Sequence, residues 1–137
     1  MGRTILATMV GIALAMATML LFEGGYGLIH PLPPGANAQD AATMNVHLAR
    51  APLPALLLVL GGWVVGAFDG GLVAALISRR HKPAAALAVG AVVVAGVIAV
   101  TSIYAHPRWM QIAGLLLPLP ASWLGAQWAR RRTARPA

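Results

Sequence analysis

The chain has 137 residues, enough for one domain, and 59% of them are hydrophobic while only 9% are charged. A soluble domain carries about 25% charged residues, so this composition excludes an ordinary water-soluble surface and predicts an integral membrane protein. The net charge is +7 and cysteine is absent, which excludes disulfides, thiolate catalysis, iron–sulfur clusters and cysteine-ligated zinc. The basic residues lie at the ends of apolar segments, so they indicate membrane orientation, and no nucleic-acid partner is expected.

Four apolar segments are each close to the roughly 20 residues that a membrane-spanning helix needs. They cover residues 4–22 or 4–29, 53–78, 84–104 and 110–129. The connection at 30–52 is long, polar and proline-rich, and we expect it outside the bilayer, with a short amphipathic piece at about 41–51. The sequence therefore predicts one all-α transmembrane domain, 1–137, built as a four-helix bundle.

Basic residues predict the direction of the spans, because cytoplasmic loops of membrane proteins carry an excess of Lys and Arg. One side of the predicted bundle receives Arg3, Arg79, Arg80, Lys82, Arg130, Arg131, Arg132 and Arg135. The other side receives Arg50 and Arg108. We therefore expect both termini in the cytoplasm, in a bacterial inner membrane, since the composition rich in Ala, Gly, Pro and Arg is typical of a high-GC bacterium.

The basic side should also attract anionic lipid headgroups, through Arg79, Arg80, Lys82, Arg130, Arg131 and Arg132. Trp109 and Trp128 begin and end the fourth segment, as aromatic anchors at membrane interfaces do. We do not expect the first segment to be cleaved as a signal peptide. Its apolar run is too long, and the "ANA" motif before Gln39 lies too far beyond it.

Small residues recur about every four positions in each apolar segment, and such ridges let membrane helices approach closely. The glycine-zipper pattern of the second segment is Gly62, Gly66, Gly70 and Ala74; the ridges of the others are Ala7, Gly11 and Ala15, then Ala88, Ala91, Ala95 and Ala99, then Ala121, Gly125 and Ala129. The pattern predicts tight packing with the second span at the centre, or with one ridge used between protomers.

The second segment, "GGWVVGAFDGGLVAAL", carries a carboxyl group, Asp69. Asp69 follows Gly62 by seven residues and so returns to within about 20° of the same direction, toward a neighbouring helix. An aspartate at the centre of a membrane helix costs about 2.5–3.5 kcal/mol, so we expect Asp69 to be protonated or hydrogen-bonded. Candidate partners at similar depth are Thr8, Ser122, Trp123 and Gln127.

The fourth segment contains "LLLPLPASW", in which Pro118 and Pro120 lack backbone N–H groups and should kink the helix. The carbonyls of Gly114 and Leu116 lose their usual partners. Free carbonyls beside an intramembrane acid are one way in which transporters hold a cation or proton. Two alternatives remain: an aspartate that fastens two helices together, and an aspartate that binds a larger partner.

A polar cluster is expected at the outer boundary, from Glu23, His30, His106 and Arg108. The structural interpretation is a buried Glu23–Arg108 or Glu23–His30 pair. A divalent metal on Glu23, His30 and His106 is the weaker interpretation, because no local ligand motif is present. The histidines lie at span ends, so haem is not expected, and we predict no metal or cofactor.

A resemblance rests on Glu23, His30-Pro31, Pro33-Pro34-Gly35, "GWVVGAFDGGLVAALISRR" and His106-Pro107-Arg108-Trp109. With these features the chain resembles small uncharacterised four-span proteins of bacterial inner membranes. The resemblance implies the topology and carries no activity. An apolar residue is commoner in that group at the position of Asp69, which makes a general ion-transport role less favoured.

Our first functional hypothesis is a non-enzymatic membrane protein that forms a homo-oligomer or serves as an accessory subunit of a larger membrane complex. The alternative is a small proton or cation transporter in which Asp69 titrates. A third, weaker alternative is an enzyme acting on lipid at the outer boundary. It is disfavoured because no catalytic constellation of nucleophile, base and orienting acid can be recognised.

Overall fold

The structure is a computed structural model that describes residues 2–78 and 81–133, and these form helices and no strand. In chain order the helices are α1 (Gly2–Ile29), α2 (Ala41–Ala49), α3 (Leu53–Ile77), α4 (Lys82–Ile103), α5 (Arg108–Leu116) and α6 (Pro118–Thr133). The helices α1, α3 and α4 are long and apolar enough to cross a membrane. The protein is thus all-helical, with three helices of membrane-spanning length.

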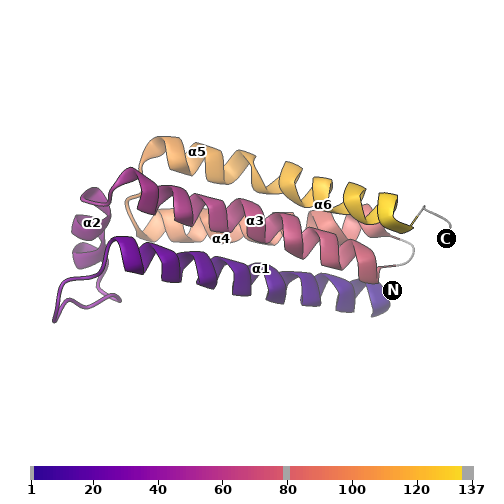
Figure 1. Cartoon of the computed structure of the whole chain (residues 1–137), viewed down its shortest axis with the longest axis horizontal. Helices are drawn as coiled ribbons and strands as arrows, with labels where there is room; N and C mark the ends of the chain where they lie inside the picture. The colour runs from indigo at the N-terminus through magenta and orange to yellow at the C-terminus, as the bar shows by residue number, and fades with distance from the viewer. Residues whose placement is uncertain (1, 79–80, 134–137) are drawn as a thin grey trace.

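The long helices lie side by side, and α5 followed by α6 forms a further row along them (Figure 1). The short helix α2 lies across one end, which we call the α2 end. The start of α1 and the end of α6 lie at the opposite end, which we call the basic end because it holds Arg3 and Arg130–Arg132. Three other expected basic residues, Arg79, Arg80 and Arg135, lie outside the described residues.

The helix α3 lies at the centre, in contact with α1, α4, α5 and α6. The core around it consists mainly of alanine and glycine, and its largest fully buried side chains are Met110, Val89, Pro118, Ser78 and Ser122. By contrast, α1 buries only Ala7, Gly11 and Ala15 along its whole length. Many exposed side chains of α1, among them Ile5, Leu6, Leu20 and Leu21, are large and apolar, which suits contact with lipid.

At the contact between α1 and α3 the two backbones touch. A Cβ atom added to Gly70 would lie 2.5 Å from the carbonyl oxygen of Gly11, and one added to Gly66 would lie 2.9 Å from that of Ala15. Gly62 packs against the side chain of Phe22. The ridge of α3 is therefore used within the chain, against the ridge of α1, because only small residues permit this approach.

A second close contact joins α3 to α6 on another side. A Cβ added to Gly71 would lie 2.7 Å from the carbonyl oxygen of Ser122, and Gly125 packs against the backbone of Phe68 and Leu72. The ridge residues Ala121 and Ala129 are buried here. The fourth ridge thus also packs inside the molecule.

The ridge of α4 does not pack inside the molecule. Ala91, Ala95 and Ala99 are exposed and Ala88 is partly buried. The buried side of α4 carries Ala85, Ala86, Val89, Gly90, Val93 and Val97 instead. The expectation that every ridge packs inside a compact bundle is therefore wrong for α4. Apolar side chains surround this helix, so the sequence pattern alone does not select its inner face.

The proline-rich segment divides into α5 and α6 at Leu117. The backbone of Leu117 remains helical, with φ −82° and ψ −34°. Its N–H donates to Ala113 at 2.9 Å, and its carbonyl accepts from Ala121 at 3.0 Å. The helical path therefore continues past the position where Pro118 and Pro120 remove two donors. A kink at these prolines stays a prediction.

The close α1–α3 contact gives a stability prediction. Replacing Gly70 with alanine should lower the free energy of unfolding by about 1–3 kcal/mol, because the new methyl group overlaps the Gly11 backbone. Gly24, whose missing Cβ has open space around it, is the matched control on α1. Thermal unfolding in detergent micelles measures both variants, and equal stability of Gly70→Ala and Gly24→Ala would contradict the packing described here.

Candidate functional site

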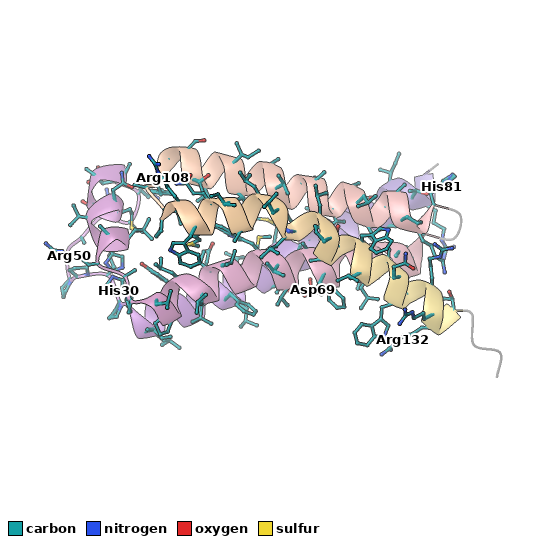
Figure 2. All side chains as sticks on the ribbon, turned by 90° about the horizontal axis from the view of Figure 1, so that it is seen from above. His30, Arg50, Asp69, His81, Arg108 and Arg132 are labelled. Atoms are coloured by element: carbon teal, nitrogen blue, oxygen red, sulfur yellow. The ribbon has the colours of Figure 1, made fainter. Side chains whose placement is uncertain are left out.

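The carboxyl group of Asp69, within the apolar helix α3, is held by a threonine of α1. Thr18 donates its hydroxyl to Oδ2 of Asp69 at 2.5 Å. The other oxygen, Oδ1, is buried and has no hydrogen-bond partner among the described residues. Figure 2 places Asp69 between the labelled residues of the two ends, nearer to His81 and Arg132 at the basic end, and a buried acid with one free oxygen in an apolar helix is a functional candidate.

The direction of side chains explains why Thr18 is the partner and Thr8 is not. The Gly11–Gly70 contact places Asp69 near the level of Ile12, between the two threonines. Side chains tilt toward the N-terminus of their own helix, so in these antiparallel helices Asp69 and Thr18 lean toward each other. The hydroxyl of Thr8 instead donates to Thr4 of its own helix at 3.0 Å.

The predicted partners on the fourth segment are also not partners of Asp69. The hydroxyl of Ser122 is buried and donates to the carbonyl of Leu119 at 2.8 Å. Trp123 and Gln127 line an open groove near the basic end. These assignments were wrong because Asp69 borders the α1 side of α3, whereas α6 packs on the side that carries Gly71. Two residues along a helix turn about 200°, so these sides are nearly opposite.

The same geometry separates Asp69 from the prolines. The carbonyl oxygen of Pro118 lies toward Gly90 of α4, while Asp69 is bonded to α1. The carboxyl group and the interrupted helix therefore belong to different helix contacts. A single ion site that combines both of them finds no support in this arrangement.

The α2 helix at the other end begins with a capped turn. Asp40 accepts from the backbone N–H of Thr43 at 2.9 Å and from its hydroxyl at 2.5 Å. These hydrogen bonds stabilise the carboxylate, the hydroxyl bond most, and so lower the pKa of Asp40 below its usual value. The chain reaches this cap through a turn at Gly35, whose φ of 79° favours glycine.

Two stacked histidines fasten α2 to the end of α1. The rings of His30 and His47 are parallel within 14°, with centroids 4.0 Å apart. Each ring places Nε2 near the other residue's backbone carbonyl, at 3.0 and 3.2 Å, so both Nε2 atoms carry a proton and donate it. On the other side, Asn45 accepts from the backbone N–H of Ala105 at 2.8 Å. We call α2 with these contacts the cover.

The four residues of the expected outer cluster are not brought together. Glu23 and Arg108 are both exposed, and His30 is engaged with His47. His106 is buried beside Trp63 and donates from Nδ1 to the carbonyl of Tyr104 at 3.0 Å. The predicted buried Glu23–Arg108 or Glu23–His30 pair is wrong, because the histidines bond to nearby backbone groups instead. Within residues 2–78 and 81–133, no group of three or more His, Asp or Glu side chains could hold a metal ion.

Comparison of the chain with protein-family models, with curated proteins and with solved structures gives no match. The resemblance to small four-span inner-membrane proteins therefore stays a prediction. A functional argument for this protein depends on the geometry of its own residues.

The sequence patterns did not identify Thr18 and His47 as contact residues. The sequence around His47 nevertheless contains a signal for its position. His47 falls within the amphipathic piece predicted at 41–51, and Asp40 followed by Thr43 marks the start of a capped helix. Placing His47 on the inner face of that helix would have suggested a contact with the first span. Thr18 left no comparable signal, because finding it requires the register between α1 and α3.

Proposed function

We propose that this chain is a non-enzymatic four-helix protein of the bacterial inner membrane that self-associates through one face of α4. In this proposal α1, α3, α4 and the α5–α6 row span the bilayer, and both termini lie in the cytoplasm. The observation that carries the proposal is the row of small side chains left uncovered on α4. We call this row, Ala84, Ala88, Ala91, Ala95 and Ala99, the α4 outer face.

The α4 outer face differs from the lipid-facing surfaces of the other helices. The exposed side chains of α1 include Leu20 and Leu21, and those of α6 include Trp123 and Leu124. Large side chains fill the space between a helix and the surrounding lipid chains. A continuous row of alanines on one exposed helix favours close contact with another helix, because association in a bilayer is driven by packing.

A second copy of the chain is the simplest partner for this face. The ridges of α1, α3 and α6 are already buried within the chain, so they are not free for a partner. Most small assemblies are symmetric dimers in which the same patch meets itself. A flat alanine row is self-complementary, and two α4 helices could therefore pack directly against each other.

Basic residues support the proposed orientation and a contact with anionic lipid headgroups. Arg130, Arg131 and Arg132 occupy the last turn of α6. The guanidinium of Arg132 lies 5.8 Å from the ring centroid of Trp128. Lys82 donates to Thr133 at 2.8 Å. A basic cluster beside an aromatic ring suits the cytoplasmic interface, where each basic residue contributes about 1 kcal/mol of attraction to anionic lipid.

The proposal predicts that Ala91→Leu combined with Ala95→Leu separates the oligomer, because two leucine side chains hold the paired helices apart. The folded chain should keep its stability, since both positions are exposed. Ala13→Leu combined with Ala17→Leu, at exposed alanines of α1, is the matched control. The particle mass after extraction in mild detergent measures the outcome.

A wild-type monomer, or an oligomer that is unchanged in the α4 double variant, would contradict self-association through α4. A stoichiometric foreign protein in place of a second copy would favour the accessory-subunit alternative. Leucine at Gly66 or Gly70 does not test association, because those glycines pack within the chain.

A second candidate function, a small proton or cation transporter, has one observation in its favour. Oδ1 of Asp69 is buried and has no hydrogen-bond partner within residues 2–78 and 81–133, which leaves one oxygen to exchange a proton or contact a cation. The separation of Asp69 from the prolines weakens the version in which both form one site. A transporter would then have to use the α1–α3 side alone.

The transporter candidate predicts pH-dependent flux in liposomes that Asp69→Asn abolishes. Asp40→Asn, which changes an exposed acid of the cover, should leave the flux intact. Flux that persists in Asp69→Asn, or the absence of flux in the wild type, would contradict this candidate.

A further inference from the structure

A cavity of about 420 Å³ lies between α1, α3 and α4, and α2 covers one end of it. This volume falls within the range of about 300–1,000 Å³ that is typical of small-ligand sites. Most of the wall is apolar and includes Met16, Met19, Val93 and Val97, and Leu48 of the cover contributes to the end. The cavity is separate from the α4 outer face and from Asp69, neither of which lines it.

The polar groups of the cavity gather at the α2 end. Glu23, Tyr26 and His106 line it there. Glu23 and Tyr26 are three residues apart on α1, which places them on the same face of that helix. The hydroxyl of Tyr26 is buried and has no hydrogen-bond partner among the described residues, which is an unfavourable state for a polar group. Because this hydroxyl is closed off from the cavity, the carboxylate of Glu23, which is exposed, is the polar group that a ligand can reach at this end.

The cavity opens sideways, between α1 and α4. At the basic end these helices are in contact, because Gly11 packs against Val89. Nearer the α2 end, Met16 and Val92 line the cavity and are also 52% and 45% exposed. Gly96 lines the same opening and has empty space where a Cβ would be. Both helices are of membrane-spanning length, so the opening faces lipid chains.

Tyr26 and Ile12, the outermost cavity residues of α1, are fourteen residues apart, which corresponds to about 21 Å of helix at 1.5 Å per residue. This length exceeds half of the roughly 30 Å hydrocarbon core of a bilayer, so a chain that spans one leaflet fits along the cavity. The polar end of the cavity lies toward the surface and the apolar end toward the midplane, as in a lipid molecule.

We propose that this cavity binds one single-chain membrane amphiphile with an uncharged, hydroxyl-bearing head. The head lies beside Tyr26 and Glu23, and the chain lies along Met16, Val93 and Val97. A hydroxyl group of the head donates to the Glu23 carboxylate. An anionic head is disfavoured because Glu23 would repel it, and the volume suits one chain and not the two chains of a phospholipid.

Tryptophan fluorescence provides the test. Trp63 lines the cavity and is only 5% exposed, so chains in the bulk bilayer do not reach it. The variant carrying Trp109→Phe, Trp123→Phe and Trp128→Phe keeps Trp63 as the sole tryptophan. It is placed in phosphatidylcholine vesicles with a small fraction of a monoacylglycerol brominated on its chain. Bromine quenches indole on contact, and we expect saturable quenching of Trp63.

Two further substitutions in the same background locate the binding. Gly96→Phe places a ring in the opening and should weaken quenching about tenfold in apparent affinity. Ala17→Phe, at an exposed alanine of α1 outside the cavity, should leave it unchanged. Glu23→Ala should weaken quenching while leaving it saturable, because it removes the carboxylate that holds the head.

Trp63 that is not quenched by the monoacylglycerol, or that is quenched equally by a brominated phosphatidylcholine, would overturn the proposal. Equal quenching by a brominated fatty acid would overturn the assignment of an uncharged head. The unmodified chain gives an independent check, since mass spectrometry after extraction in nonionic detergent should find one single-chain lipid per chain. Its absence would also contradict the proposal.

Discussion

The backbone contact between α1 and α3 is the constraint on which the rest of the structure depends. Gly11 and Gly70 approach so closely that a single methyl group on either would overlap the opposite carbonyl. This contact fixes the register of the two helices, and the register in turn brings Thr18 to Asp69. It also holds α1 to α3 along the α3 ridge, and α1 touches α4 near the basic end, where Gly11 reaches Val89.

The separation of α1 from α4 beyond that point creates the cavity beneath α2. The cover then closes the end of the cavity, through the His30–His47 stack on one side and Asn45 on the other. A core made of small residues accounts for both the close α1–α3 contact and the cavity. Tight contacts arise where small side chains face each other, and space remains where helices diverge without large side chains to fill the gap.

The distribution of small residues supports self-association for the same reason. Membrane helices gain little from moving an apolar side chain out of lipid, so close packing must provide the stabilisation. The ridges of α1, α3 and α6 gain this stabilisation by packing inside the chain, whereas the α4 outer face does not pack inside it. Exposed alanines on α4 would leave the protein surface poorly packed against disordered lipid chains, whereas a second α4 offers a matching flat surface.

Much of the helical architecture was predictable from the sequence, and the faces of the helices were less so. The length of the apolar segments predicted helices long enough to cross a membrane, and α1, α3 and α4 confirm three helices of that length. The α3 ridge was recognised because glycine is unusual in a helix without a packing reason. The α4 ridge could not be oriented, because a helix that is apolar all round has no periodicity that separates lipid from protein.

Polar contacts were the hardest part to predict. Asp69 was expected to contact another helix, and it does, but Thr18 replaced the candidates chosen by depth alone. Residues at the same depth need not meet, because contact also depends on the tilt of the side chains and on the side of the helix against which each neighbour packs. His47 likewise pairs with His30 through a fold-back of the connection, which spacing in the sequence does not encode.

Disulfide crosslinking in native membranes tests the central claim of self-association most directly. The chain contains no cysteine, so one introduced thiol reports on one position. A disulfide requires Cα atoms about 4.4–6.8 Å apart, a separation that paired α4 helices would provide. Ala95→Cys on the α4 outer face should crosslink two copies on oxidation, and Ala17→Cys on α1 should not. Crosslinking at position 17 with none at position 95 would contradict the account.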